Sequence, residues 1–244
     1  MNAPTRKLEA YRYADVAALA SVWNELAQPE RIEVSARQEL QQIWLSSGEE
    51  VQVRRVEMTL AAGASAHIFA LNTAPRYGRI ELDVSLHDGA DFTLDAANIG
   101  GGNSTLEIVT TVRHLGVAAT SRQTVRSVLG GTATGSYMGK VAVARDAQQT
   151  DSVQSIKAML LTRGATANAK PELEIYADDV KCAHGASVGE LDRDQLFYAA
   201  ARGLDPASAR ALLLDGFVSG LWDGIDGDDR GIVAAARVAL RAVA

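Results

Sequence analysis

The feature of this chain that most constrains its fold is a change of hydrophobic period near residue 32. From there to about residue 177, apolar and polar residues alternate in short bursts, as in residues 80–86 (Ile-Glu-Leu-Asp-Val-Ser-Leu). A period of two places successive side chains on opposite faces of a β-strand. β-Branched residues are frequent here and helix caps are scarce, so the sequence predicts many short strands joined by small turns.

A weak internal repeat indicates how these strands are arranged. In residues 60–64, 86–90, 161–165 and 182–186, an apolar or sulfur residue is followed three positions later by Gly-Ala. The first two copies begin 26 residues apart and the last two 21 residues apart. Glycine permits the positive φ of a tight corner, and periods of about 20 to 30 residues are typical of stacked coils. We therefore favour a β-solenoid over an antiparallel sandwich, since Asp88-Gly89 is the one candidate for a tight hairpin turn.

The two ends of the chain carry helical patterns. Residues 7–27 have apolar side chains at spacings of three and four, and a following Gln-Pro pair ends that pattern. We expect an N-terminal helical segment over residues 1–30, a solenoid core over residues 31–190 and a C-terminal helical subdomain over residues 191–244.

Three helices are expected in the C-terminal part. Asp192 precedes the residues of the first helix, and Gly203 is a typical C-cap for it. Asp205 is a typical N-cap for the second helix, and Pro206 follows it in the first turn. The third helix begins near residue 229 and has one apolar stripe. That stripe comprises Val233, Ala236, Leu240 and Val243.

Composition and charge exclude several classes of function. Hydrophobic residues make up 47% of the 244 residues and charged residues 22%, which is ordinary for a globular protein. The net charge of −6 leaves no large basic surface, so nucleic acid is not the expected partner. There is neither an apolar run long enough to cross a membrane nor a recognisable secretion signal, and a single cysteine is typical of a reducing compartment. We expect a cytoplasmic protein without a membrane span.

The strongest candidate for chemistry is the pair Cys182 and His184, two residues apart. If the backbone is extended, the thiol and the imidazole lie on the same face, and together they suit iron or zinc. Two ligands cannot complete a metal site, so a partner must supply the rest. The alternative is a buried cysteine beside a hydrogen-bonded histidine, since Val180 shares their parity and makes that face apolar.

Other polar motifs carry weaker signals. Asp178 and Asp179 are adjacent, so in a strand they would point to opposite faces, and a solvated turn is favoured. Residues 100–102 are three glycines, but neither they nor Lys140 stand in a P-loop pattern, so we expect no nucleotide to be bound by this chain. Residues 145–154 are rich in amides and hydroxyls, which either form a ladder between coils or line an interface.

The remaining histidines have no spacing that favours a metal site, and surface or turn positions are expected for them. They are His67, His87 and His114.

Several sequence blocks resemble the SufD side of the SufB/SufD family, whose members are scaffold components of the SUF iron–sulfur cluster assembly system. The resemblance extends from about residue 4 to residue 222, and its most specific part is the run Asp-Asp-Val-Lys-Cys-Ala-His-Gly. The matching blocks are residues 4–13, 139–143, 147–151, 171–185, 192–198, 202–203, 209–210, 213 and 216–217.

The resemblance implies a right-handed parallel β-helix followed by helices, mainly β in class. It also implies a heterodimer with a SufB-like subunit and docking of a SufC-like ATPase on residues 204–222. A homodimer of the isolated chain is kept as an alternative. The expected ATPase-docking residues are Leu212, Leu213, Gly216 and Phe217.

The function expected from this resemblance is that of a non-enzymatic scaffold. Its cargo is a transient iron–sulfur cluster shared with the partner subunit, with His184 and Cys182 as the ligands from this chain. The main alternative is a solenoid hydrolase or lyase that acts on polysaccharides through acids such as Asp178 and Asp179. A third reading is a structural partner whose cysteine and histidine are inert.

Overall fold

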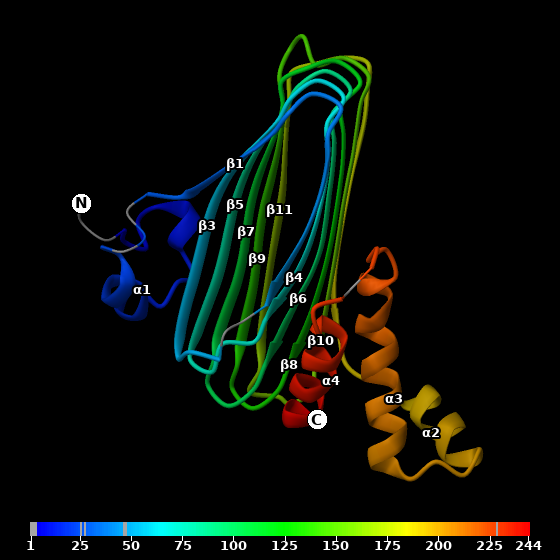
Figure 1. Cartoon of the computed structure of the whole chain (residues 1–244). Helices are drawn as coiled ribbons and strands as arrows, with labels where there is room; N and C mark the ends of the chain where they lie inside the picture. The colour runs from blue at the N-terminus through cyan, green and yellow to red at the C-terminus, as the bar shows by residue number, and fades with distance from the viewer. Residues whose placement is uncertain (1–3, 25, 27, 46–47, 228) are drawn as a thin grey trace.

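The computed structural model shows a flattened parallel β-solenoid with a short N-terminal segment on one side and helices on the other (Figure 1). The structure describes residues 4–24, 26, 28–45, 48–227 and 229–244. The expected mainly β architecture is confirmed. Every strand pairing given by the described residues is parallel, so the sandwich alternative is wrong.

Two six-stranded sheets face each other. The first, sheet A, contains the odd-numbered strands: β1 (Glu30–Val34), β3 (Val51–Leu60), β5 (Tyr77–Leu86), β7 (Thr105–His114), β9 (Thr134–Val143) and β11 (Thr166–Ile175). The second, sheet B, contains the even-numbered strands: β2 (Glu39–Leu45), β4 (Ser65–Asn72), β6 (Asp91–Gly100), β8 (Thr120–Leu129), β10 (Thr150–Leu160) and β12 (Val180–Gly189).

The register of the ladders explains the repeat. Val51 pairs with Tyr77, which is 26 residues later, the same interval as between the first two Gly-Ala corners. At those corners Gly63 and Gly89 have φ values of 66° and 62°, a conformation that glycine adopts without steric cost. The copy at residues 182–186 was wrongly assigned to a corner, because it lies inside β12.

The core lies between the sheets and follows the period of two. In β5, for example, Leu82, Val84 and Leu86 point inward and are at most 1% exposed. The buried apolar side chains of successive coils form one continuous cluster. Burial of this face in the inner coils fixes which side chains lie inside the solenoid.

The N-terminal segment packs on the outer face of sheet A, but not as the single helix expected over residues 7–27. A short 3₁₀ turn, η1 (Glu9–Tyr11), precedes the helix α1 (Val16–Val22), whose N-cap is Asp15. Residues 1–3, 25 and 27 lie outside the described residues. The segment is not one continuous helix because its apolar side chains pack on the sheet, where Tyr11, Leu19 and Trp23 are buried.

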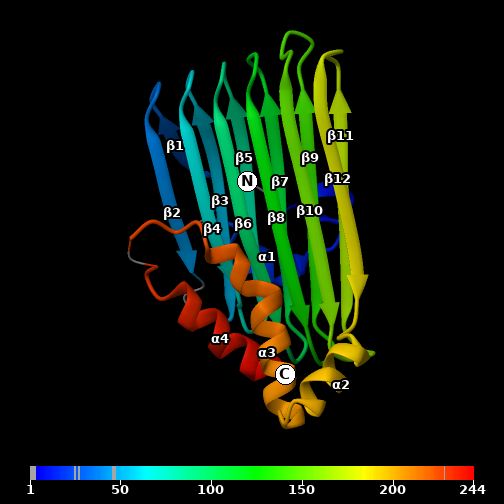
Figure 2. The same ribbon diagram turned by 90° about the vertical axis from the view of Figure 1, so that its right-hand side faces the viewer.

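The C-terminal helices cover part of sheet B. They are α2 (Arg193–Ala201), α3 (Pro206–Ser219) with the 3₁₀ turn η2 (Gly220–Trp222), and α4 (Ile232–Val243). The N-caps of α2 and α3 are Asp192 and Asp205, of which only Asp205 was expected, and each accepts two backbone N–H bonds. Figure 2 shows α3 and α4 lying across the outer face of sheet B near the carboxyl ends of its strands.

The last helix begins at Ile232 rather than near residue 229, because Gly231 with φ 78° forms its N-cap. Of its expected stripe, Ala236 and Leu240 are buried, while Val233 and Val243 are partly buried. Within the described residues, every helix is too short or too polar to span a lipid bilayer.

Candidate functional site

Cys182 and His184 lie on β12, the last strand of sheet B, at the open end of the solenoid (Figure 2). The extended backbone expected for this motif is present. In the ladder with β10, Cys182 is opposite Ser152 and His184 is opposite Gln154. Cys182 is half-buried and His184 is exposed. Both side chains therefore lie on the face that points into the solenoid, but in a coil with no following coil to cover it.

The thiol of Cys182 is not preformed as a thiolate. Burial raises its pKa, the negative charge of Asp151 raises it further, and a hydrogen bond with the backbone of Ser152 opposes both effects. Metal coordination needs the deprotonated sulfur, so a metal cation or a positively charged partner must favour its ionisation. In the part of the chain that the structure describes, no three His, Cys, Asp or Glu side chains gather to hold a metal. The pair is at most half of a site.

The open end has an unprotected strand edge. β12 hydrogen-bonds only with β10 among the described strands, and its ten residues include a single formal charge, Lys181. At the opposite end of the solenoid the edge strands are shorter: β1 has five residues with three charges, and β2 has seven residues with one charge, Glu39. Charged, short edge strands resist pairing with another chain, whereas long uncharged ones favour it. At the β12 end, Tyr176 is 61% exposed and Val188 is 50% exposed.

A polar column extends from this end into the core. The imidazole Nε2 of His114 lies 2.9 Å from Ser121 Oγ, which lies 2.8 Å from Ser152 Oγ. Ser121, Ser152 and Cys182 occupy the same register position in three successive coils of sheet B. A row of polar side chains therefore crosses the interior of the last coils, beside buried apolar residues such as Val125 and Ile156.

A second row of polar side chains lies beside the first. Gln123, Gln154 and His184 share one register position in successive coils. Gln123 Oε1 accepts hydrogen bonds from Thr110 (2.6 Å) and Tyr137 (3.1 Å). Gln154 Nε2 donates to the Tyr137 hydroxyl at 3.0 Å. The amide-rich stretch thus forms a ladder between coils, one of the two expected alternatives.

Three residues of these polar rows were not expected from the sequence: Ser121, Gln123 and Tyr137. The signal that could have revealed them is parity, because Gln123 alternates in phase with buried Val125 and Tyr137 with buried Val141. A polar residue in phase with the apolar face of a strand points into the core.

The other histidines occupy three different environments. His87 is exposed at a turn, as expected. His67 lies on the outer face of sheet B, with its Nε2 2.7 Å from Asp95 Oδ2. The expected surface or turn position is wrong for His114, which is fully buried because its strand position points inward.

Acid is expected to destabilise the protein through His114. Burial lowers the pKa of His114 to about 4, with the backbone of Ala119 partly opposing the effect. In the unfolded chain His114 binds a proton with its ordinary pKa, about 6.5. The contribution of His114 to stability is therefore fully present above about pH 6.5 and is lost as the pH falls towards 4. Between about pH 7.5 and pH 5, this group should cost about 2 kcal/mol of unfolding free energy.

Urea unfolding at both pH values measures this loss. His114→Gln is the matched variant, since it keeps a polar side chain and removes the titration. The pH-dependent loss should shrink in that variant by about the same 2 kcal/mol. An identical pH dependence in the two proteins would contradict the assignment.

Asp178 and Asp179 lie at a bend between β11 and β12, and both are exposed. The expected solvated turn is confirmed. The backbone N–H of Asp179 donates to Gln148 Oε1 at 2.9 Å, so this bend is tied to the previous coil. Nothing in their placement favours a catalytic carboxylate pair.

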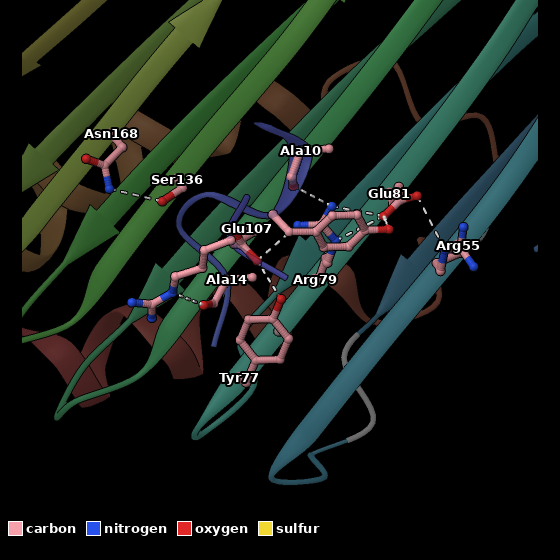
Figure 3. Close-up of polar contacts among 12 residues, drawn as sticks. Ala10, Ala14, Arg55, Tyr77, Arg79, Glu81, Glu107, Ser136 and Asn168 are labelled. Carbon is pink, nitrogen blue, oxygen red and sulfur yellow. Dashed lines mark hydrogen bonds and ion pairs between the residues drawn. The ribbon is translucent and has the colours of Figure 1, made fainter. Parts of the chain in front are cut away.

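A buried charged network fastens the N-terminal segment to sheet A (Figure 3). Arg79 donates to Glu107 at 3.1 Å, to Glu81 at 2.9 Å and to the carbonyl of Ala10 at 2.8 Å. Tyr77 donates to Glu107 at 2.5 Å. The segment is therefore held on the outer face of the solenoid, away from Cys182 and His184. This network was not expected from the sequence, because Arg79 and Glu107 become in-register neighbours only through the pairing of β5 with β7.

The expected docking residues on α3 divide into two groups. Leu212 is 57% exposed and Gly216 is also exposed, whereas Leu213 and Phe217 are half-buried. Phe217 packs against the cluster between α3 and sheet B. Leu212 lines a hollow of about 710 Å³ between α3 and α4.

Comparison with known proteins agrees with these features. A family model described as "SUF system FeS cluster assembly, SufBD core domain" matches residues 30–217, which run from β1 to α3. "Protein ABCI7, chloroplastic" of Arabidopsis thaliana is 51% identical over 83 residues, 34% of this chain and 18% of that protein.

Two bacterial proteins named "Iron-sulfur cluster assembly protein SufD" are also similar. The Escherichia coli protein is 32% identical over 123 residues, 50% of this chain and 29% of that protein. The Bacillus subtilis protein is 27% identical over 165 residues, 68% of this chain and 36% of that protein. The chain thus matches well under two thirds of the length of each relative. Because the family model covers more than half of its residues, the chain belongs to the SufB/SufD family of the SUF system for iron–sulfur cluster assembly.

Proposed function

We propose that this chain is a non-enzymatic scaffold for a nascent iron–sulfur cluster, which it holds together with a SufB-like subunit. The observation that carries the proposal is the position of Cys182 and His184 on one face of an open edge strand. A cluster needs about four protein ligands, so a second subunit must supply the others. Completing the site across a subunit boundary makes cluster binding depend on the assembled complex and leaves the cluster transferable.

The β12 end supports pairing with another chain. Its long, nearly uncharged edge suits strand addition, in which backbone hydrogen bonds extend a sheet across the interface. The exposed apolar side chains Tyr176 and Val188 add surface to bury there. A SufB-like subunit is the proposed occupant, and a second copy of this chain is the alternative in its absence.

The exposed side of α3 is the proposed docking surface for a SufC-like ATPase. Leu212 and Gly216 face outward, one helical turn apart, beside the hollow between α3 and α4. Leu213 and Phe217 then serve mainly to hold α3 in place. Nucleotide hydrolysis changes the cluster site only if the ATPase binds two states of the complex with different affinity. The nucleotide itself belongs to the ATPase.

Replacing His184 with alanine should reduce cluster retention by at least about tenfold. Loss of a residue that orients a ligand already lowers metal affinity by about that factor, and loss of the ligand itself lowers it further. The measurement is iron and sulfide content of the complex after anaerobic reconstitution with SufB-like and SufC-like partners. Co-purification of the three chains tests the proposed partners in the same experiment.

His87→Ala is the matched control, since that histidine is exposed at a turn far along the chain from β12. It should leave the iron content unchanged. Undiminished iron and sulfide in the His184→Ala complex would remove His184 from the site.

A further inference from the structure

The inner neighbour of His184 is Gln154, on β10. The two residues are paired in register on adjacent parallel strands, and both line a shallow hollow of about 390 Å³. Gln154 is 1% exposed, whereas His184 is exposed at the open end. A buried amide therefore lies directly beneath the proposed metal ligand.

The hydrogen bonds of Gln154 are incomplete. Its Nε2 donates to the Tyr137 hydroxyl at 3.0 Å, which fixes the orientation of the amide. Its Oε1 is buried and accepts no hydrogen bond from the residues that the structure describes. Leaving a buried acceptor without a donor is unfavourable, so such an atom in a polar ladder calls for an explanation.

We propose that Gln154 is a positioning residue for His184. Its Oε1 accepts the ring N–H of His184 when the other ring nitrogen binds the cluster iron. This inference rests on the proposed ligand role of His184. A histidine that binds a metal almost always donates its second ring N–H to an acceptor, which fixes the tautomer and the ring orientation.

The strand geometry allows this contact. Side chains at the same register position of adjacent strands are separated by about 4.8 Å at the backbone. In the proposed contact the exposed imidazole turns towards Gln154 Oε1, while the two strands keep their register. The orphaned acceptor is thus satisfied by the ligand that it orients.

The alternative donor is Gln123, in the same register one coil further inside. Its Nε2 is buried and has no acceptor among the described residues. If Gln123 Nε2 satisfied Gln154 Oε1, the two glutamines would form only a structural ladder. Substituting either one would then affect the cluster site equally.

The experiment compares Gln154→Met, Gln154→Glu and Gln123→Met in the reconstituted complex. The readout is the rate at which a chelator removes iron under anaerobic conditions, with thermal melting as the check on folding. Gln154→Met should release iron about 10- to 100-fold faster than wild type. Gln154→Glu keeps an acceptor and should restore slow release, and Gln123→Met should remain near wild type in release rate.

A second readout uses the chain alone with Zn²⁺ as a diamagnetic probe. The ring ¹⁵N shifts of His184 should show a single tautomer in wild type and a mixture in Gln154→Met. A structural role for Gln154 would not change this signature. It also keeps the test informative if a variant complex assembles poorly.

The outcomes separate the two proposals. If His184→Ala loses iron but Gln154→Met behaves like Gln123→Met, the positioning role is overturned and the scaffold proposal stands. If His184→Ala retains its iron, the ligand role fails, and the positioning role fails with it. Equal tautomer mixtures in wild type and Gln154→Met also overturn the positioning role.

Discussion

Replacing Arg79 with methionine should lower the free energy of unfolding by about 3–5 kcal/mol, the usual cost of leaving a buried charge unpaired. The Arg79 and Glu107 side chains are both fully buried, and their closest atoms are 3.1 Å apart. Methionine fills similar volume but leaves the Glu107 carboxylate without its cation. It also removes the bond to the Ala10 carbonyl that holds the N-terminal segment. Urea unfolding at neutral pH measures the loss.

Two comparisons identify the cause of that loss. The double variant Arg79→Met/Glu107→Gln removes both charges, so it should be more stable than Arg79→Met alone. Arg237→Met breaks an exposed ion pair with Asp215 and should cost less than about 1 kcal/mol. If Arg79→Met cost no more than Arg237→Met, the buried network would not be what fastens the segment.

Gly139→Ala should destabilise the protein by roughly 3–5 kcal/mol, through overpacking and loss of hydrogen bonds. A Cβ on Gly139 would overlap the hydroxyl and the ring of Tyr137. Tyr137 is 1% exposed and cannot move into solvent. Its displacement would also break the bonds that its hydroxyl makes with Gln123 and Gln154. The measurement is again the free energy of unfolding in urea.

Gly185→Ala is the matched control, because Gly185 is also within a strand and has no heavy atom within 4 Å of the added Cβ. The isolated chain should be unchanged or stabilised by about 0.5 kcal/mol, since alanine restricts the unfolded state. A similar loss in both variants would show that strand glycines, rather than the Tyr137 contact, decide the stability.

The solenoid could be predicted from local patterns because successive coils repeat the same two features, an alternation of apolar and polar residues and a tight corner. The alternation in residues 80–86 and the corners at Gly63 and Gly89 reappear in the structure in the expected order. The corner assignment failed at Gly185, which has the same sequence spacing but lies in β12. A Gly-Ala pair permits a corner without requiring one, and the pairing of the whole strand with β10 decided the outcome.

The N-terminal segment is a second element whose structure the sequence pattern did not predict correctly. Its apolar spacing predicted a long helix, whereas contacts with sheet A stabilise a broken segment in which Tyr11 stacks on Arg79 at 4.4 Å. A short helix is only marginally stable alone, so tertiary contacts outweigh its local preference.

The sequence by itself determined which side chains face inward, because a period of two assigns every second residue in a strand to one face. It therefore placed Cys182 and His184 together on one face of a strand. Only the tertiary structure decided that Gln154 is buried while His184, in the same row, is exposed. The physical reason is that a solenoid residue is covered by the neighbouring coils. His184 lies in the last coil, where no following strand covers it among the described residues.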